Sequence, residues 1–187
     1  MSRIETRFAD LRRKSEKALV AYLTVGFPTL QIFPDLSRTC EEAGVDVLEL
    51  GVPFSDPLAD GPTIQAASEK ALQQGVSLAL VLDQVRQLRR RDIQIPLVLM
   101  TYFNPVLAYG IKAFFRDGKA SGMDGVIVPD LPPEEAEDLV DAARTYGVDT
   151  IFLASPTSSV ERLARIVAVS TGFLYYVSLT GVTGARR

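Results

Sequence analysis

Short apolar runs alternate along this chain with segments whose apolar positions recur every three or four residues. The runs are rich in Val, Leu, Ile and Tyr, which is typical of strands buried on both faces of a parallel sheet. The segments between them have the period of amphipathic helices. We predict strands at 19–24, 46–51, 96–102, 125–129, 149–154 and 173–178, and helices near 29–43, 62–74, 78–91, 111–121, 132–146 and 158–169. No low-complexity segment or linker interrupts them, so residues 1–187 form a single predicted domain.

Six βα units fit either a doubly wound sheet or part of a (β/α)8 TIM barrel. No GxGxxG follows the first strand, and polar or aromatic residues stand instead at several strand ends: Thr24, Glu49, Tyr102, Asp130 and Tyr175. Chemistry spread over the carboxyl ends of many strands is typical of the barrel. A complete barrel has eight such units in about 250 residues. We therefore predict a TIM barrel of which this chain holds the first six βα units, a truncated or incompletely represented form.

Alternation along each strand predicts which side chains face the barrel interior. An apolar slot with a few polar tips could hold an aromatic bicycle, so interior residues can also be substrate-binding residues. Ordinary core packing is the alternative for all of them, and the pattern favours it for Met100, Ile127 and Leu153. The predicted interior residues are Tyr22, Glu49, Met100, Tyr102, Ile127, Leu153 and Tyr175.

The stretch 46–65, DVLELGVPFSDPLADGPTIQ, has one acidic residue in a buried strand and two more in the loop that follows. Glu49 stands where Val or Ile would be usual, and a buried carboxylate is costly unless it is paired, hydrogen-bonded or protonated. It is either satisfied by a partner or kept for acid–base work. Pro62 fits the first helical position, so Asp60 lies outside the helix and is the second candidate, whereas Asp56 is interpreted as structural or interfacial.

Composition excludes several kinds of site. The chain has 20 basic and 23 acidic residues, which gives a net charge of −3 and no basic footprint for nucleic acid. A single cysteine and no histidine disfavour a zinc site and remove the usual general base. No apolar run approaches the roughly 20 residues that span a bilayer. The charged N-terminus MSRIETRFADLRRK is helical in pattern and unlike a signal peptide. We expect a cytoplasmic protein.

Five blocks in order resemble the tryptophan synthase α-subunit family. They are FPT at 27–29, the 46–65 stretch, TYFNPVLAYG at 101–110, GVIVPDLPPEE at 125–135 and YYVSLTGVTGARR at 175–187. The resemblance covers essentially the whole chain. It implies a lyase of tryptophan biosynthesis that cleaves indole-3-glycerol phosphate to indole and glyceraldehyde 3-phosphate. No metal or organic cofactor is implied, because the indole ring is itself the electron sink.

The resemblance also implies roles for individual residues. Glu49 would shuttle protons and Asp60 would stabilise the charge that develops on the indole nitrogen. Thr183 would contact the loop that carries Asp60, with the backbone of Gly184 near the phosphate. A pyridoxal-phosphate-dependent β subunit is the implied partner in an α2β2 assembly. Its expected contacts are Pro53, Asp56, Asn104 and Pro105.

Two alternatives remain at this point. One is another phosphate-sugar enzyme on the same barrel, since fold alone does not decide function. The other is a non-catalytic allosteric partner of the β subunit. Glu49 and Asp60 disfavour this second alternative, because an interface does not need a carboxylate inside a barrel.

Overall fold

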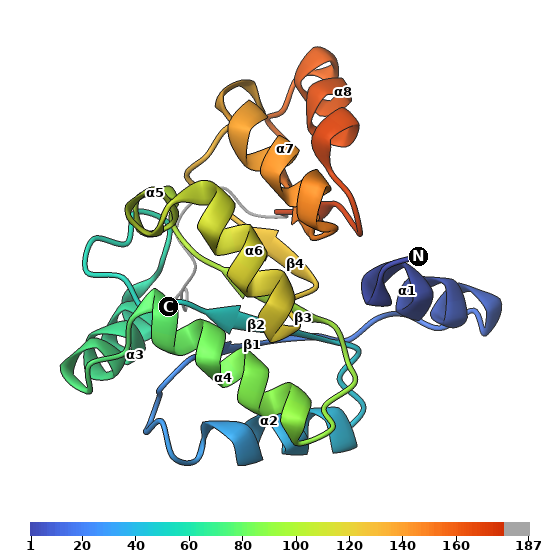
Figure 1. Cartoon of the computed structure of the whole chain (residues 1–187). Coiled ribbons are helices and arrows are strands. Elements are labelled where there is room, and N and C mark those ends of the chain that lie inside the picture. Colours follow the sequence, from blue (N-terminus) through green and yellow to red (C-terminus); the bar gives the residue numbers. More distant parts are fainter. Residues whose placement is uncertain (178–187) are drawn as a thin grey trace.

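The computed structural model describes residues 1–177, and the described strands form a parallel α/β arrangement (Figure 1). Neighbouring strands follow the chain order, and each pair is joined through at least one helix, as expected for βα units. The five-stranded sheet contains β1 (Val20–Thr24), β2 (Val47–Gly51), β3 (Leu97–Met100), β4 (Gly125–Ile127) and β5 (Asp149–Ile151). The first four predicted strands are therefore confirmed, with β3 and β4 shorter than predicted, and the fifth is confirmed in its first part.

The predicted strand at 149–154 is interrupted at Phe152. Its second part, β6 (Leu153–Ala154), pairs in parallel with β7 (Tyr175–Tyr176), so only the middle of the predicted strand 173–178 is extended. Backbone hydrogen bonds from Tyr175 N–H to the Phe152 carbonyl and from Val177 N–H to Ala154 continue the pairing. The chain from β5 to β6 is thus bonded to β4 on one side and to β7 on the other, which carries the curl of the sheet onward.

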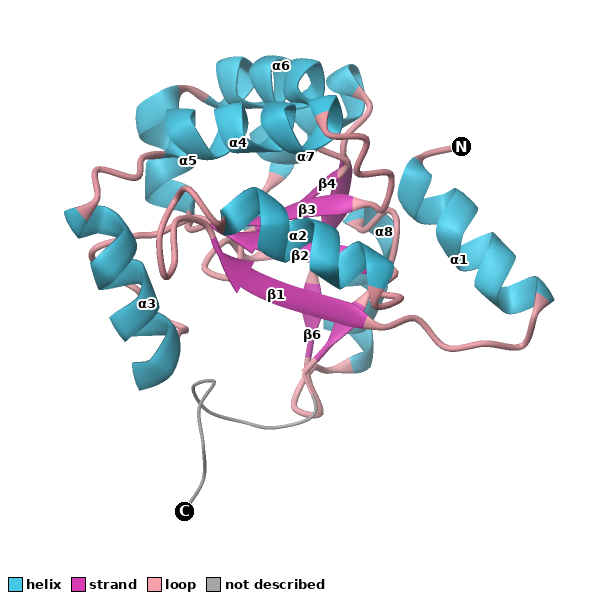
Figure 2. Cartoon of the chain, turned by 90° about the horizontal axis from the view of Figure 1, so that it is seen from below, coloured by secondary structure: helices cyan, strands magenta, loops and turns pink. Residues whose placement is uncertain are grey.

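Helices cover the outer face of the sheet, and α1 lies at the end where the strands begin (Figure 2). Pro62 opens α3 with Gly61 as its N-cap, as predicted from the sequence. Ser2 and Glu5 form a capping box at α1. The helices are α1 (Arg3–Arg13), α2 (Phe33–Glu42), α3 (Pro62–Gln73), α4 (Leu78–Arg90), α5 (Phe103–Tyr109), α6 (Ile111–Ser121), α7 (Glu137–Tyr146) and α8 (Val160–Val169).

Two helical details differ from the prediction. The short helix α5 was not predicted, and both carboxylate oxygens of Asp130 accept a hydrogen bond from the N–H of Phe103 at its start. The helix predicted over 132–146 begins as a separate 3-10 turn, η1 (Pro133–Glu135), and the α-helix proper starts only at Glu137. Such turns are frequent at the beginnings of α-helices.

Two apolar clusters lie on the two faces of the sheet. The larger packs the outward side chains of the strands, Leu48 and Leu99 among them, against the surrounding helices. The smaller lies on the interior face and is completed by Ile4 of α1, with Phe8 of α1 stacked on Phe173 at 5.4 Å between ring centroids. Its other members are Val47, Val98, Met100, Ile127, Ile151, Leu153 and Tyr175. The predicted inward orientation of Met100, Ile127, Leu153 and Tyr175 is therefore confirmed.

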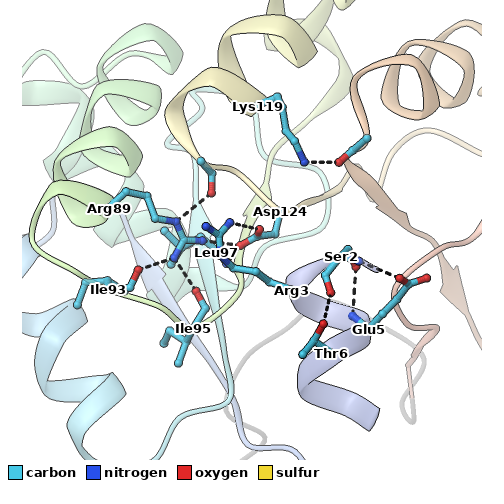
Figure 3. Close-up of polar contacts among 12 residues, drawn as sticks. Ser2, Arg3, Glu5, Thr6, Arg89, Ile93, Ile95, Leu97, Lys119 and Asp124 are labelled. Carbon is cyan, nitrogen blue, oxygen red and sulfur yellow. Dashed lines mark hydrogen bonds and ion pairs between the residues drawn. The ribbon is translucent and has the colours of Figure 1, made fainter. Parts of the chain in front are cut away.

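Ion pairs fix α1 at the end where the strands begin. Asp124, just before β4, accepts from Arg3 of α1 and from Arg89 of α4 (Figure 3). Arg7 of α1 bonds Asp46, which precedes β2. Ion pairs and packing thus occupy the end of the described structure where the strands begin. A functional site is therefore expected at the opposite end, where the strands finish. Among residues 1–177, no helix is long and apolar enough to cross a membrane.

Candidate active site

Glu49 occupies the middle of β2, where every residue of the strand is buried. Its Cα pairs with Tyr22 on one side and Val98 on the other, so its side chain projects into the barrel interior as predicted. Among the residues that the structure describes, none hydrogen-bonds the buried Oε1 of Glu49. Burial raises the pKa of Glu49 from 4.5 to about 7. The group can therefore both give and accept a proton near neutral pH.

Asp60 lies in the loop between β2 and α3, directly before the N-cap Gly61. It is partly buried, and this burial raises the pKa of its carboxyl while a hydrogen bond with Tyr102 lowers it. Its backbone carbonyl accepts from Nε2 of Gln65 in the first turn of α3 at 2.8 Å. The carboxyl is thus placed at the mouth of the barrel, above the strand that carries Glu49.

Tyr102 connects this loop to the body of the barrel. Its hydroxyl accepts from the N–H of Ala59 at 3.0 Å, and its ring lies 5.4 Å from that of Phe54. Burial is the main reason why the pKa of Tyr102 is raised to about 12. The sequence predicted Tyr102 as an interior residue, but its contact with Ala59 and Asp60 joins segments 42 or more positions apart and was not predicted.

Two further tyrosines stand near Glu49. The hydroxyl of Tyr22 lies against the backbone of Gly51, where a Cβ would come within 1.9 Å of it. Burial raises the pKa of Tyr22 to about 12, with smaller contributions from Asp60 and Glu49. Burial and the charge of Glu49 also raise the pKa of Tyr175. Tyr22 is also the Cα partner of Glu49 across the β1–β2 pair.

The apolar residues predicted to bind substrate differ in exposure. Met100 and Leu153 are partly exposed on the interior face, whereas Ile127 is fully buried. Ile127 therefore packs beneath the partly exposed interior residues rather than contacting a ligand directly. Thr183 and Gly184, the remaining predicted substrate contacts, lie outside the described residues.

The predicted partner contacts lie near the same mouth. Asp56 and Asn104 are exposed and Pro105 is partly exposed, whereas Pro53 is buried and can shape the loop only from below. Two large apolar side chains that sequence reasoning missed, Leu58 and Leu107, are 78% and 50% exposed in the same two segments. Leu58 and Leu107 lie in the two blocks 46–65 and 101–110 that resemble the family. A large apolar residue close to Asp56 and another close to Asn104 were the signals that the sequence offered. Within residues 1–177, no cluster of three or more potential metal ligands occurs.

A curled parallel sheet with one carboxyl inside β2 and a second in the loop after it is typical of an enzyme of the (β/α)8 barrel class. Solved structures agree: the tryptophan synthase α subunit of Legionella pneumophila superposes with a TM-score of 0.93 and 42% identity, over 95% of this chain and 68% of that one. A sequence model described as "Tryptophan synthase alpha chain" matches residues 8–187. The chain belongs to the tryptophan synthase alpha chain family.

Curated relatives extend this likeness. The tryptophan synthase alpha chain of Roseiflexus castenholzii is 54% identical over 187 residues, which are 100% of this chain and 72% of the relative. That of Geotalea uraniireducens is 52% identical over 186 residues, covering 69% of its length. The resemblance and the partial barrel inferred from the sequence are confirmed. The family consists of lyases that cleave indole-3-glycerol phosphate in tryptophan biosynthesis.

Proposed function

We propose that Glu49 and Asp60 carry out the cleavage of indole-3-glycerol phosphate to indole and glyceraldehyde 3-phosphate in this chain. Breaking the bond between indole C3 and the glycerol carbon needs a proton on C3, so that neutral indole can leave. It also needs the proton of the adjacent hydroxyl to be removed as the aldehyde forms. A buried carboxyl with a pKa of about 7 suits both transfers, and this property of Glu49 is the observation that carries the proposal.

Asp60 has the complementary role. Protonation at C3 places positive charge on the indole nitrogen, and a carboxylate near that N–H stabilises it. The hydrogen bond with Tyr102 favours the charged form of Asp60 against the effect of burial. Tyr102 therefore favours the ionised form of Asp60 and bonds the backbone of its loop at Ala59.

The interior wall supplies the binding surface for the bicyclic ring. Met100 and Leu153 offer apolar contacts, Ile127 supports them, and Tyr22, Tyr102 and Tyr175 add aromatic faces with polar tips. Thr183 and Gly184 remain predicted contacts of the loop and phosphate. We propose that the reaction uses no cofactor of its own, because the ring accepts the electrons of the breaking bond. Pyridoxal phosphate belongs to the partner.

The partner is the tryptophan synthase β subunit, which consumes indole in the α2β2 assembly. We place its contact surface on the loop containing Asp56 and on α5, which carries Asn104 and Pro105. The exposed Leu58 and Leu107 support this placement, because they add apolar area in the same two segments.

An indole-release assay tests the proposal, with and without the β subunit. Glu49→Gln removes the exchangeable proton while preserving shape, so kcat should fall by about 10² or more. Glu42→Gln, at an exposed position near the end of α2, is the matched control and should retain full activity. A different phosphate-sugar enzyme would release no indole at all. A non-catalytic partner would stimulate the β subunit while Glu49→Gln changed nothing, and either result would overturn the proposal.

A further inference from the structure

The hydroxyl of Tyr22 is held in an unusually restricted position. Tyr22 of β1 is the Cα partner of Glu49 in β2, so the two side chains leave the sheet on the same face. The ring leans toward the carboxyl ends of the strands and lies over Gly51, where a Cβ would meet its Oη at 1.9 Å and its Cζ at 2.4 Å. Only glycine at position 51 leaves room for this arrangement.

A long hydrogen bond from Thr24 biases the direction of the Tyr22 hydroxyl. Oγ1 of Thr24 donates to Oη of Tyr22 over 3.5 Å. A phenol oxygen that accepts from one side directs its own proton to another acceptor. With its pKa raised to about 12 by burial, Tyr22 keeps that proton throughout the neutral range. It is therefore a permanent hydrogen-bond donor on the sheet face that carries Glu49.

Glu49 requires such a donor when it is ionised. Tyr22 of β1 is its Cα partner, the charge of Glu49 acts on Tyr22 and on Tyr175 of β7, and the charge of Asp60, from the loop after β2, acts on Tyr22. Oε1 of Glu49 is buried without a bond from the described residues, and an ionised carboxylate in that state is costly. A carboxylate of Asp60 has no proton to donate, so the two phenols are the candidate donors. Tyr22 is the better placed, because Gly51 and Thr24 restrict it, while β7 is only two residues long.

We propose that the Tyr22 hydroxyl is a positioning group that donates a hydrogen bond to the ionised carboxylate of Glu49 and holds it toward the barrel interior. The bond forms when Glu49 has given up its proton and is released when the proton returns. Tyr22 thereby assists each exchange between the acid and base states of Glu49. The inference rests on the proposed role of Glu49, but its test does not depend on catalysis.

The test is a titration of the Glu49 carboxyl carbon by NMR in protein with labelled glutamate, with the signal assigned from its loss in Glu49→Gln. A hydrogen bond to the charged form of a carboxyl lowers its pKa. Tyr22→Phe should therefore raise the pKa of Glu49 by about one unit, a tenfold change in its ionisation constant. In the indole-release assay, kcat should fall about tenfold with little change in KM. Thr24→Val should shift the pKa in the same direction by less.

Two phenylalanine variants serve as comparisons. Tyr176→Phe, an exposed neighbour on β7, should leave the pKa of Glu49 and kcat unchanged. Tyr175→Phe tests the competing donor. An unchanged pKa in folded Tyr22→Phe, or an equal or larger shift in Tyr175→Phe, would overturn the proposal. If Tyr22→Phe does not fold, Thr24→Val decides, and no shift in that variant counts against the inference.

Discussion

Glu49 links the chemistry of the site to the stability of the protein. Burial raises its pKa from 4.5 to about 7, so the folded protein binds this proton more tightly than the unfolded chain does. The stabilising contribution is therefore fully present below about pH 4.5 and is lost as the pH rises through about 7. The full difference corresponds to a free energy on the order of 3 kcal/mol.

We accordingly expect Glu49→Gln to be more stable than the parent protein at pH 8, by up to about 3 kcal/mol in the free energy of unfolding. At pH 5 the difference should be much smaller, since both side chains are then neutral. Urea unfolding of the two proteins at both pH values measures this. A stability difference that does not change with pH would mean that burial does not raise the pKa of Glu49.

Asp60 and Asp56 lie four positions apart and should respond differently to the same substitution. Asp60→Asn removes the charge that is to stabilise the indole nitrogen, so kcat should fall by about 10². Asp56 is exposed and bonds only Ser55 among the described residues. Asp56→Asn should leave the isolated activity near normal and weaken stimulation by the β subunit. Indole release with and without that subunit distinguishes the two, and the assignment is wrong if the effects are exchanged.

The interior position of Glu49 could be predicted, because side chains alternate strictly along a strand and its neighbours are apolar. The environment of Asp60 could not be predicted from the sequence. It depends on Tyr102, the N-cap residue of α5, whose hydroxyl accepts a hydrogen bond from the backbone N–H of Ala59 in the β2–α3 loop. A contact between residues so distant in sequence leaves no periodic signal. The same holds for the closeness of Tyr22 to Gly51, since Gly51 resembles an ordinary loop glycine in the sequence.

At the scale of elements, α5 shows where local pattern is insufficient. Its sequence FNPVLAY contains an Asn-Pro pair that indicates a turn. Proline is nevertheless tolerated in the first turn of a helix, where its missing N–H has no intrahelical partner to lose. The helix start is fixed by Asp130, which is 27 residues away. The six longer predicted helices had enough apolar positions on one face to be recognised without such help.

Asp130 should therefore be important for the site without touching substrate. Asp130→Ala removes the acceptor at the start of α5, which should cost about 1 kcal/mol of stability. It should also lower kcat several-fold, because Tyr102, the N-cap residue of α5, positions the loop of Asp60. Asp130→Asn keeps a side-chain oxygen acceptor and should restore most of both. Urea unfolding and indole release test this, and equal losses in the two variants would contradict the capping role.

At the scale of the whole molecule, the two ends of the barrel have separate tasks. Glu49 and Asp60 belong to the site that opens at the carboxyl ends of the strands, while Asp124 and its partners lie where the strands begin. In (β/α)8 enzymes chemistry belongs to the first end and stability to the second. The sequence predicted the first end from polar residues at strand ends. It did not reveal the second, because the pairing of α1 with Asp46 and Asp124 depends on how that helix packs across the barrel.

This division predicts that Asp124→Ala destabilises the protein without altering its chemistry. Asp124 accepts from Arg3 at 2.9 Å, from Arg89, and from the N–H of Leu97 at 2.9 Å. Its removal leaves the mostly buried guanidinium of Arg89 without its carboxylate, which should cost about 3–5 kcal/mol. Asp141→Ala, which breaks only the exposed pair with Arg144, should change stability by less than about 1 kcal/mol. Under conditions where Asp124→Ala is folded, kcat for indole release should match the parent protein. A loss of kcat as large as that of Asp60→Asn would show that the two ends of the barrel are coupled, and the division between them would not hold.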